Sequence, residues 1–177
     1  MDIVLPDPSL VLLIGVAGSG KSTFARRHFA PTEIVSSDHC RALVCDDENN
    51  QAVNQDAFAL VHSIAAKRLA HGKLTVIDAT NVQDKARRFF RRLAAVREVP
   101  LVAIVFDFSL EVALVQNAQR QHRSVPPEII QEQQTALQEM LSALVEEEFQ
   151  AIHVLTSPAK VAALTIQRKK VYPDQSD

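Results

Sequence analysis

Short runs of consecutive apolar residues alternate along the chain with longer stretches in which apolar residues recur every three or four positions. The short runs predict buried β-strands, and the wider spacing predicts helices with one apolar face. Strands are predicted at residues 9–14, 33–36, 74–77, 101–108 and 151–155. Strands that alternate with helices form parallel sheets covered on both faces, so the pattern predicts an α/β fold. Ligands of such sheets bind beyond the carboxyl ends of the strands.

Helices are predicted between these strands, and several have a recognisable first residue. The predicted helical segments are 22–29, 54–69, 158–167 and the stretches that follow residues 84, 109 and 126. Asp84 and Ser109 are suited to cap a helix, and Pro127 suits a first helical position. The acidic and amide-rich residues 43–53 predict a loop. We expect one domain at residues 1–168 and a polar tail or linker at residues 169–177.

Composition limits the kinds of partner that this domain can bind. Of the 177 residues, 47% are hydrophobic and 23% are charged, with a formal net charge of −2. A grip on nucleic acid must therefore come from a local basic patch rather than from the overall charge. No apolar run reaches the about eighteen residues of a membrane span. Cys40 and Cys45 have no metal-ligand pattern around them, which favours reduced thiols and a cytoplasmic location.

A glycine-rich segment between the first strand and the first helix matches a phosphate-binding motif in full. Residues 15–22 read Gly-Val-Ala-Gly-Ser-Gly-Lys-Ser and fit G-x-x-x-x-G-K-[ST]. Its backbone N–H groups and the helix N-terminus would face the phosphates of ATP. We expect Lys21 to reach the β- and γ-phosphates and the Ser22 hydroxyl to ligate Mg²⁺. The predicted phosphate-binding residues are Gly15, Gly18, Ser19, Gly20, Lys21, Ser22 and Thr23.

Asp38 follows the second predicted strand, which would bring it to the edge of the sheet where ligands bind. A kinase that acts on a hydroxyl needs a carboxylate to accept the proton and orient the attack. Arg41 lies one helical turn later, so that both side chains could face one substrate. The alternative is that Asp38 only caps a helix. We interpret Asp38 as the catalytic base.

Asp78 ends the third predicted strand and opens the sequence Asp78-Ala-Thr-Asn81. An acidic residue at the end of an apolar strand is a common second anchor for Mg²⁺, often through water. Asp107 also follows an apolar strand, but Thr80 and Asn81 add polar groups near Asp78, which makes Asp78 the preferred metal residue. The alternative for Asp78 is a turn-forming role.

Two groups of arginines are candidates for binding phosphates. Arg120 and Arg123 are one turn apart on a predicted helix, where they could close over ATP as a lid and neutralise charge on the transferring phosphoryl group. The alternative is a solvated helix face. A second group follows Asn81 and could hold a nucleic-acid backbone, or form an ordinary charged surface. It comprises Arg87, Arg88, Arg91 and Arg92, of which Arg87 is nearest to the sheet edge.

The phosphate-binding motif, Ser37-Asp38-His39-Cys40-Arg41 and Asp78-Ala-Thr-Asn81 occur in an order that resembles the 5′-OH polynucleotide kinase family. The chain is most similar to the N-terminal kinase module of bacterial polynucleotide kinase–phosphatase–ligase proteins, which repair RNA. The resemblance covers nearly the whole chain and implies a P-loop kinase fold, a parallel sheet flanked by helices with a helical lid. It also implies that phosphatase and ligase domains would follow in a larger polypeptide.

Specific roles follow from this resemblance. It implies Asp38 as general base, Lys21 and Arg120 as further catalytic residues, and Arg123 as a second lid arginine. The residues expected to contact the acceptor are Arg41, Asn81 and Arg87. One departure is Gln116, which stands where another lid arginine is expected and is predicted to share one helix face with Arg120 and Arg123. Glutamine can hydrogen-bond a phosphate but cannot neutralise its charge.

Three functions compete at this stage. The first is transfer of the γ-phosphate of ATP, or of another NTP, to the 5′-OH end of RNA or DNA during end-healing repair, with Mg²⁺ or Mn²⁺. The second is a P-loop kinase that phosphorylates a small hydroxyl metabolite, and the third is a nucleotide-binding module without catalysis. The presence of a cradle, a base and a metal carboxylate favours the first two, and the resemblance favours the first.

Overall fold

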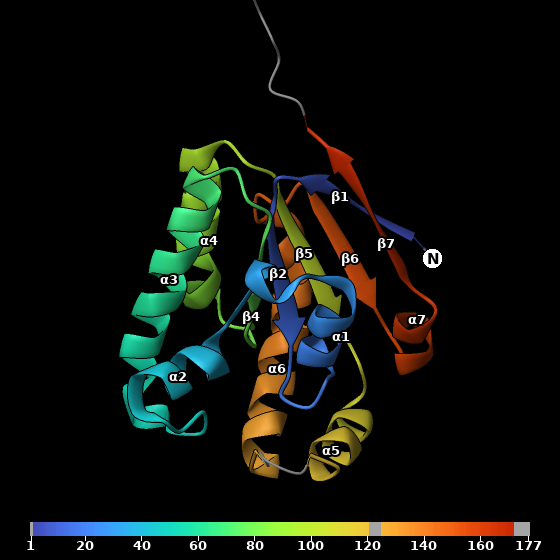
Figure 1. The fold of residues 1–177 in the computed structure, drawn as a ribbon. Coiled ribbons are helices and arrows are strands. Elements are labelled where there is room, and N and C mark those ends of the chain that lie inside the picture. Colours follow the sequence, from blue (N-terminus) through green and yellow to red (C-terminus); the bar gives the residue numbers. More distant parts are fainter. Residues whose placement is uncertain (1, 121–124, 172–177) are drawn as a thin grey trace, which may run out of the picture.

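The computed structural model describes residues 2–120 and 125–171. Its main sheet has five parallel strands in the order β3-β4-β2-β5-β6 (Figure 1). These strands are β2 (Leu10–Gly15), β3 (Ile34–Ser36), β4 (Thr75–Asp78), β5 (Leu101–Phe106) and β6 (Ala151–Leu155). Every residue of β2 is buried, as expected for a central parallel strand. The predicted α/β parallel-sheet fold is confirmed.

Alternate residues of β2 pack into two different cores. Leu10, Leu12 and Ile14 belong to the core beneath three long helices. These helices are α3 (Asn54–Ala70), α4 (Asp84–Arg97) and α6 (Pro127–Ala143). Val11 and Leu13 point to the opposite face, because successive side chains of a strand alternate. That face is covered by α1 (Lys21–His28), α7 (Pro158–Ala162) and a pair of outer strands.

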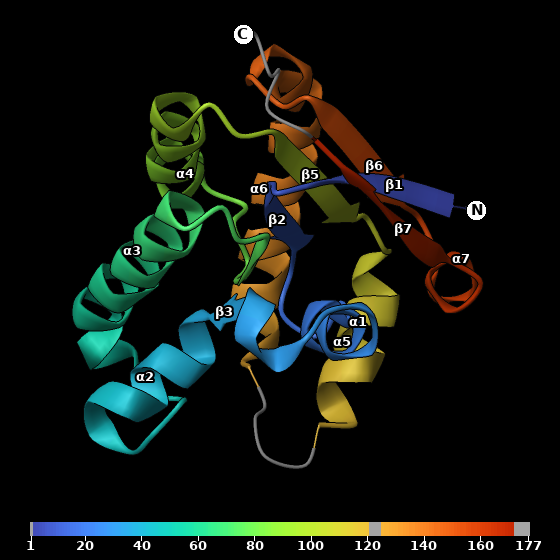
Figure 2. The same ribbon diagram turned by 45° about the horizontal axis from the view of Figure 1, so that its top comes forward.

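The outer strands, β1 (Asp2–Asp7) and β7 (Thr165–Lys170), pair in parallel and form a sheet of their own. Figure 2 shows them side by side near β6. Both were missed by the sequence prediction, and β7 crosses the expected boundary at residue 168. Arg168 of β7 also anchors the strand, because its guanidinium makes two 2.7 Å bonds to the Glu33 carboxylate. The domain therefore extends at least to Lys170.

The remaining elements refine the predicted boundaries. Helix α2 (Ser37–Cys45) extends into the segment predicted as a loop, and a 3-10 turn, η2 (Gln51–Val53), ends that segment. Ser109 caps α5 (Leu110–Ala118) as predicted, with its Oγ accepting the N–H of Val112. The predicted cap at Asp84 is wrong, because α4 already begins at that residue. Two more 3-10 turns are η1 (Pro31–Glu33) and η3 (Leu144–Glu146).

No helix among residues 2–120 and 125–171 is long and apolar enough to cross a membrane.

Candidate active site

A cleft of about 1300 Å³ opens at the carboxyl ends of the central strands. Strand pairing aligns Asp78 of β4 with Leu13 of β2 on one side and with Ser36 of β3 on the other. The loops that leave these three strands therefore begin at one edge of the sheet. They supply the phosphate-binding loop, Asp38 and Thr80 to the walls of a single cleft.

The phosphate-binding loop adopts backbone angles that require glycine at two positions. Gly18 has a φ of +83°, and a Cβ atom there would lie 2.6 Å from the carbonyl oxygen of Ala113 in α5. Gly20 has a φ of +87° and caps the first turn of α1. Both angles lie in the left-handed region that side chains other than glycine rarely adopt. The loop is thereby bent over the N-terminus of α1, where backbone N–H groups attract anions.

Lys21 lies within this loop and is 7% exposed. Its Nζ donates to the carbonyl oxygens of Gly15, at 2.9 Å, and of Val16, at 2.8 Å. The amine is thus directed along the inner side of the loop. Because an ammonium group has three donors and rotates freely on a flexible stem, Lys21 can exchange these carbonyls for phosphate oxygens without a change in the backbone.

Asp38 and Arg41 form an ion pair on α2. The helix is capped by Ser36, whose Oγ accepts the N–H of His39 at 3.3 Å. Asp38 therefore does not serve as the cap, and its Oδ1 accepts a hydrogen bond from Nη2 of Arg41. Both residues line the cleft.

Arg41 is anchored by all three of its nitrogens. Besides Asp38, it donates from Nε to the carbonyl of Glu48, at 2.7 Å, and from Nη1 to Oδ1 of Asn54, at 3.0 Å. Burial lowers the pKa of the Arg41 guanidinium, while the Glu48 carboxylate counteracts this shift. The residue joins α2, the loop after it and α3, and so fixes the position of the Asp38 carboxylate.

Asp78 lines the cleft and is 6% exposed, whereas Asp107 does not line it. Asp107 accepts a 2.8 Å hydrogen bond from Nε2 of Gln138 instead. Asp78 is thus the one of these two carboxylates that lines the cleft, and its role as a metal residue stays a prediction. Within residues 2–120 and 125–171, no group of three or more histidine, cysteine, aspartate or glutamate side chains could hold a metal by itself.

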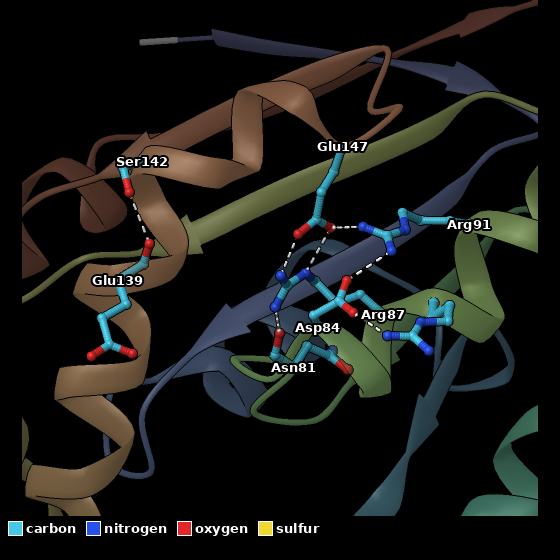
Figure 3. Close-up of polar contacts among 8 residues, drawn as sticks. Asn81, Asp84, Arg87, Arg91, Glu139, Ser142 and Glu147 are labelled. Carbon is cyan, nitrogen blue, oxygen red and sulfur yellow. Dashed lines mark hydrogen bonds and ion pairs between the residues drawn. The ribbon is translucent and has the colours of Figure 1, made fainter.

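Asn81 and Arg87, both expected to contact the acceptor, lie outside the cleft. Asn81 is 2% exposed and donates from Nδ2 to the carbonyl of Leu13, at 2.8 Å. Arg87 is also 2% exposed, donates from Nη1 to the Asn81 carbonyl at 2.8 Å, and pairs with Glu147 (Figure 3). Burial and these partners leave neither side chain able to reach a substrate. Both hold the loop after β4 instead.

The arginine surface proposed on α4 is likewise engaged by carboxylates. Arg88 and Arg91 each make a 2.7 Å bond to Asp84, and Arg91 makes a further 2.7 Å bond to Glu147 (Figure 3). None of these side chains lines the cleft. Arg87, Arg88 and Arg91 thus form an ion-pair network with Asp84 and Glu147, whereas Arg92 is exposed, and the phosphate-backbone patch on this helix stays a prediction.

Of the residues predicted for the lid helix, the structure describes Gln116 and Arg120. Arg120 and Gln116 line the cleft, but α5 ends at Ala118, so the predicted single helix face through residues 116, 120 and 123 does not continue. Arg123 lies outside the described residues. Asn117 of α5 makes two hydrogen bonds to the backbone of Val125, donating to its carbonyl at 2.9 Å and accepting its N–H at 3.1 Å.

Two side chains at the site were missed by the sequence prediction. Gln133 of α6 accepts the N–H of Ala17 in the phosphate-binding loop at 2.8 Å. A signal for it existed, since Gln133 lies between Ile130 and Leu137 on the apolar face of that helix. Asn54 was read only as a helix start, and no local pattern reveals that it holds Arg41.

Solved structures of other proteins share this fold. The chain aligns with a chain of the Pnkp1/Rnl/Hen1 RNA repair complex at a TM-score of 0.66 and 23% identity, covering 78% of this chain and 47% of the other. It thus spans about half of that protein. The expected similarity to RNA-repair kinases is confirmed at the level of the fold.

Kinases of small molecules also align with the chain. The Mycobacterium tuberculosis APS kinase CysC, in complex with AMPPNP and APS, aligns at a TM-score of 0.53 and 16% identity, over 87% of this chain and 91% of that one. A sugar kinase from a Janibacter species aligns at a TM-score of 0.57 and 18% identity, covering 87% of this chain and 90% of the other.

Sequence comparisons identify the family. No curated protein sequence matches the chain. The profile of the AAA_33 family, described as an AAA domain, matches residues 10–146. This range includes the phosphate-binding loop, Asp38, Asp78 and Arg120, which line the same cleft. The chain therefore belongs to the AAA_33 family and has the fold of a P-loop kinase.

Proposed function

We propose that this protein transfers the γ-phosphate of ATP to the 5′-hydroxyl end of RNA or DNA. The observation that carries the proposal is the Asp38–Arg41 pair, which lines the same cleft as the phosphate-binding loop. A carboxylate held beside a γ-phosphate site is the group that a hydroxyl acceptor requires. The order of motifs that resembles polynucleotide kinases, and the fold shared with the RNA repair complex, support the nucleic-acid acceptor.

In the proposed reaction, the 5′-oxygen attacks the γ-phosphorus and its proton passes to the Asp38 carboxylate. The bond between the γ-phosphorus and the β,γ-bridging oxygen breaks, and ADP leaves. Lys21 and Arg120 stabilise the charge on the transferring group. Arg41 keeps Asp38 in place, because its own position is fixed by Glu48 and Asn54.

Ser22 and Asp78 would hold the magnesium ion that accompanies ATP. Both line the cleft, and one hydroxyl with one carboxylate suits a hard cation that keeps several waters and takes phosphate oxygens. When bound, the ion would neutralise charge on the β- and γ-phosphates.

We place the two substrates at different ends of the cleft. One end is bounded by Asp38, Arg41 and the start of α3, and the other by Arg27, Pro158 and Ala162. The phosphates occupy the loop between these ends. Because the acceptor must lie beside Asp38, the nucleoside of ATP belongs at the end formed by α1 and α7.

The proposal is tested by label transfer from γ-³²P-ATP with Mg²⁺ to a short 5′-OH oligonucleotide. The same oligonucleotide with a 5′-phosphate is the control, since it lacks the attacking hydroxyl. We expect label on the 5′-OH strand alone. If ATP binds but neither RNA nor DNA acquires label, the nucleic-acid acceptor is wrong.

A second candidate is phosphorylation of a small hydroxyl metabolite. The chain covers about nine-tenths of the APS kinase and sugar kinase chains, but only 47% of the repair-complex chain. In the label-transfer assay, a small hydroxyl compound that outcompetes the oligonucleotide as acceptor would favour this function. If the polynucleotide function holds, phosphatase and ligase domains are the expected partners, as in the proteins that the motif order resembles.

A further inference from the structure

Phe58 is an aromatic side chain at the acceptor end of the cleft. Four phenylalanines line the cleft within the described residues. Three of them, Phe24, Phe29 and Phe108, are at most 5% exposed and belong to the core on the α1 face of the sheet. Phe58 is partly exposed and packs against the other core. Its ring is therefore the one that a ligand in the cleft can contact.

Phe58 lies one helical turn from Asn54, which holds the arginine of the proposed catalytic pair. It follows Asn54 by four residues on α3, so both side chains share one helix face. Asn54 holds the Arg41 guanidinium at 3.0 Å, and Arg41 pairs with Asp38. Figure 2 shows the beginning of α3 next to α2, which carries that pair. A molecule whose hydroxyl reaches Asp38 would thus extend along this wall.

The surroundings of Phe58 indicate a flat ligand with a polar edge. Polar residues that line the same cleft include Glu48, Gln51, Asn54 and Thr80, alongside the small apolar residues Ala42 and Ala79. An aromatic ring set among hydrogen-bonding groups is the arrangement that accepts a nucleobase, whose face is apolar and whose edge is polar. A small aliphatic acceptor would leave the ring uncovered.

The ring of Phe58 adjoins a cluster of other aromatic rings. The centroid of His62 lies 6.0 Å from that of Phe58, and His62 stacks on Phe89 at 3.8 Å. Phe90 meets both His62 and Phe89 edge-on. These contacts join α3 to α4 and limit the movement of the Phe58 side chain. A preorganised surface loses little entropy when a base stacks on it.

We propose that Phe58 stacks against the base of the 5′-terminal nucleotide while the 5′-hydroxyl of that nucleotide contacts Asp38. This inference rests on the proposed function and specifies the part of the acceptor that is recognised. Stacking on a phenylalanine ring tolerates any base, because every base presents a π-face. The enzyme should accept all four 5′-terminal bases and discriminate against an end that lacks a base.

The experiment compares two acceptors that differ only in the 5′-terminal base: a normal 5′-OH oligonucleotide and one with an abasic 5′-terminal residue. With the wild-type protein, we expect the KM of the abasic acceptor to be about 5- to 30-fold higher. Phe58→Leu should raise the KM of the normal acceptor by a similar factor and leave that of the abasic acceptor unchanged. The KM of ATP should change less than about twofold. Phe58→Trp, which retains a ring, should restore the preference.

Each outcome decides the inference. Equal KM values for the two acceptors with the wild-type protein would overturn it, even if the leucine variant failed to fold. An equal rise for both acceptors in Phe58→Leu would also overturn it, because the ring would then act through packing. Transfer to neither oligonucleotide would overturn the proposed function itself, whereas transfer to both with equal KM would overturn only the role of Phe58.

Discussion

Arg41 and Arg87 have the same chemistry and opposite roles. Both are at most 3% exposed, and each donates from all three side-chain nitrogens. Each pairs with a carboxylate and also holds a backbone carbonyl, of Glu48 or of Asn81. Arg41 lines the cleft and Arg87 does not. Position, and not residue type, therefore separates the arginine at the site from the arginine of the scaffold.

The two carboxylates that pair with these arginines differ in their exposure to solvent. The side chain of Glu147, which pairs with Arg87, is 9% exposed, whereas that of Asp38, which pairs with Arg41, is 27% exposed. In an ion pair that serves only the fold, both side chains can be buried. Removal of one side chain then leaves the other as a buried charge without a partner. A pair that serves catalysis must leave the carboxylate accessible to substrate. We expect the two arginines to differ in the same way when they are replaced.

The largest effect on stability is expected for Arg87→Ala. The substitution leaves the Asn81 carbonyl without its donor and Glu147 with Arg91 as its remaining partner. We expect a loss of about 3 kcal/mol in the free energy of unfolding, near the lower limit for breaking a buried pair. Urea denaturation measures it, and the KM for acceptor of the folded variant should stay within about twofold of wild type.

A double replacement serves as the control for Arg87→Ala. In Arg87→Met with Glu147→Leu, no buried charge lacks a partner, so much of the stability should return. If Arg87→Ala instead retained full stability and raised the KM for acceptor, Arg87 would belong to the site, and the contrast with Arg41 would be lost.

A smaller effect, on catalysis, is expected for Arg41→Lys. An ammonium group keeps the charge but cannot reach Asp38, Asn54 and the Glu48 carbonyl at once. Misplacement of the Asp38 carboxylate should lower kcat/KM for acceptor about 10- to 100-fold, with little change in the KM of ATP. Arg87→Lys is the matched variant and should lose stability without this loss of activity. Equal losses for acceptor and ATP in Arg41→Lys would contradict an acceptor-side role.

The smallest effect concerns His62, which lies between the two regions. It contacts Phe58 near the cleft and stacks on Phe89 of the helix that carries Arg87. Burial lowers the pKa of His62 below its unfolded value of about 6.5. Its contribution to stability is thus complete above about pH 6.5 and is lost as pH falls toward the folded pKa. Between pH 7.5 and 5, the free energy of unfolding of His62→Phe should depend less on pH than that of the wild-type protein. The same pH dependence in both proteins would contradict this role of His62.

Local patterns were sufficient to predict most of the fold. Buried strands such as β2 and β5 appear as apolar runs, and the phosphate-binding loop is encoded by neighbouring residues. The strands β1 and β7 were missed because each has only the other as its hydrogen-bonding neighbour, with Asp2 opposite Thr165 more than 160 residues later. No short window of sequence contains that pairing.

The sequence correctly placed in the cleft the residues that follow strand ends. It misplaced residues whose position depends on partners far away in the sequence. Asp38 and Asp78 reach the cleft because parallel strands end at one edge. Arg87 has a suitable position on α4, yet Glu147, sixty residues later, covers it. The predicted face through Gln116 and Arg120 was incorrect because α5 ends between them. These outcomes depend on tertiary contacts that spacing alone does not encode.

Under the proposed function, Asp38 is held by Arg41 and activates the acceptor in the same cleft that binds ATP. The most direct test measures label transfer to a 5′-OH oligonucleotide by Asp38→Asn, together with ATP binding. We predict a fall in kcat of about 10²- to 10⁴-fold, with the Kd for ATP changed less than about twofold. Transfer at the wild-type rate would remove Asp38 from the mechanism, and loss of ATP binding in the folded variant would show that it serves the cradle instead.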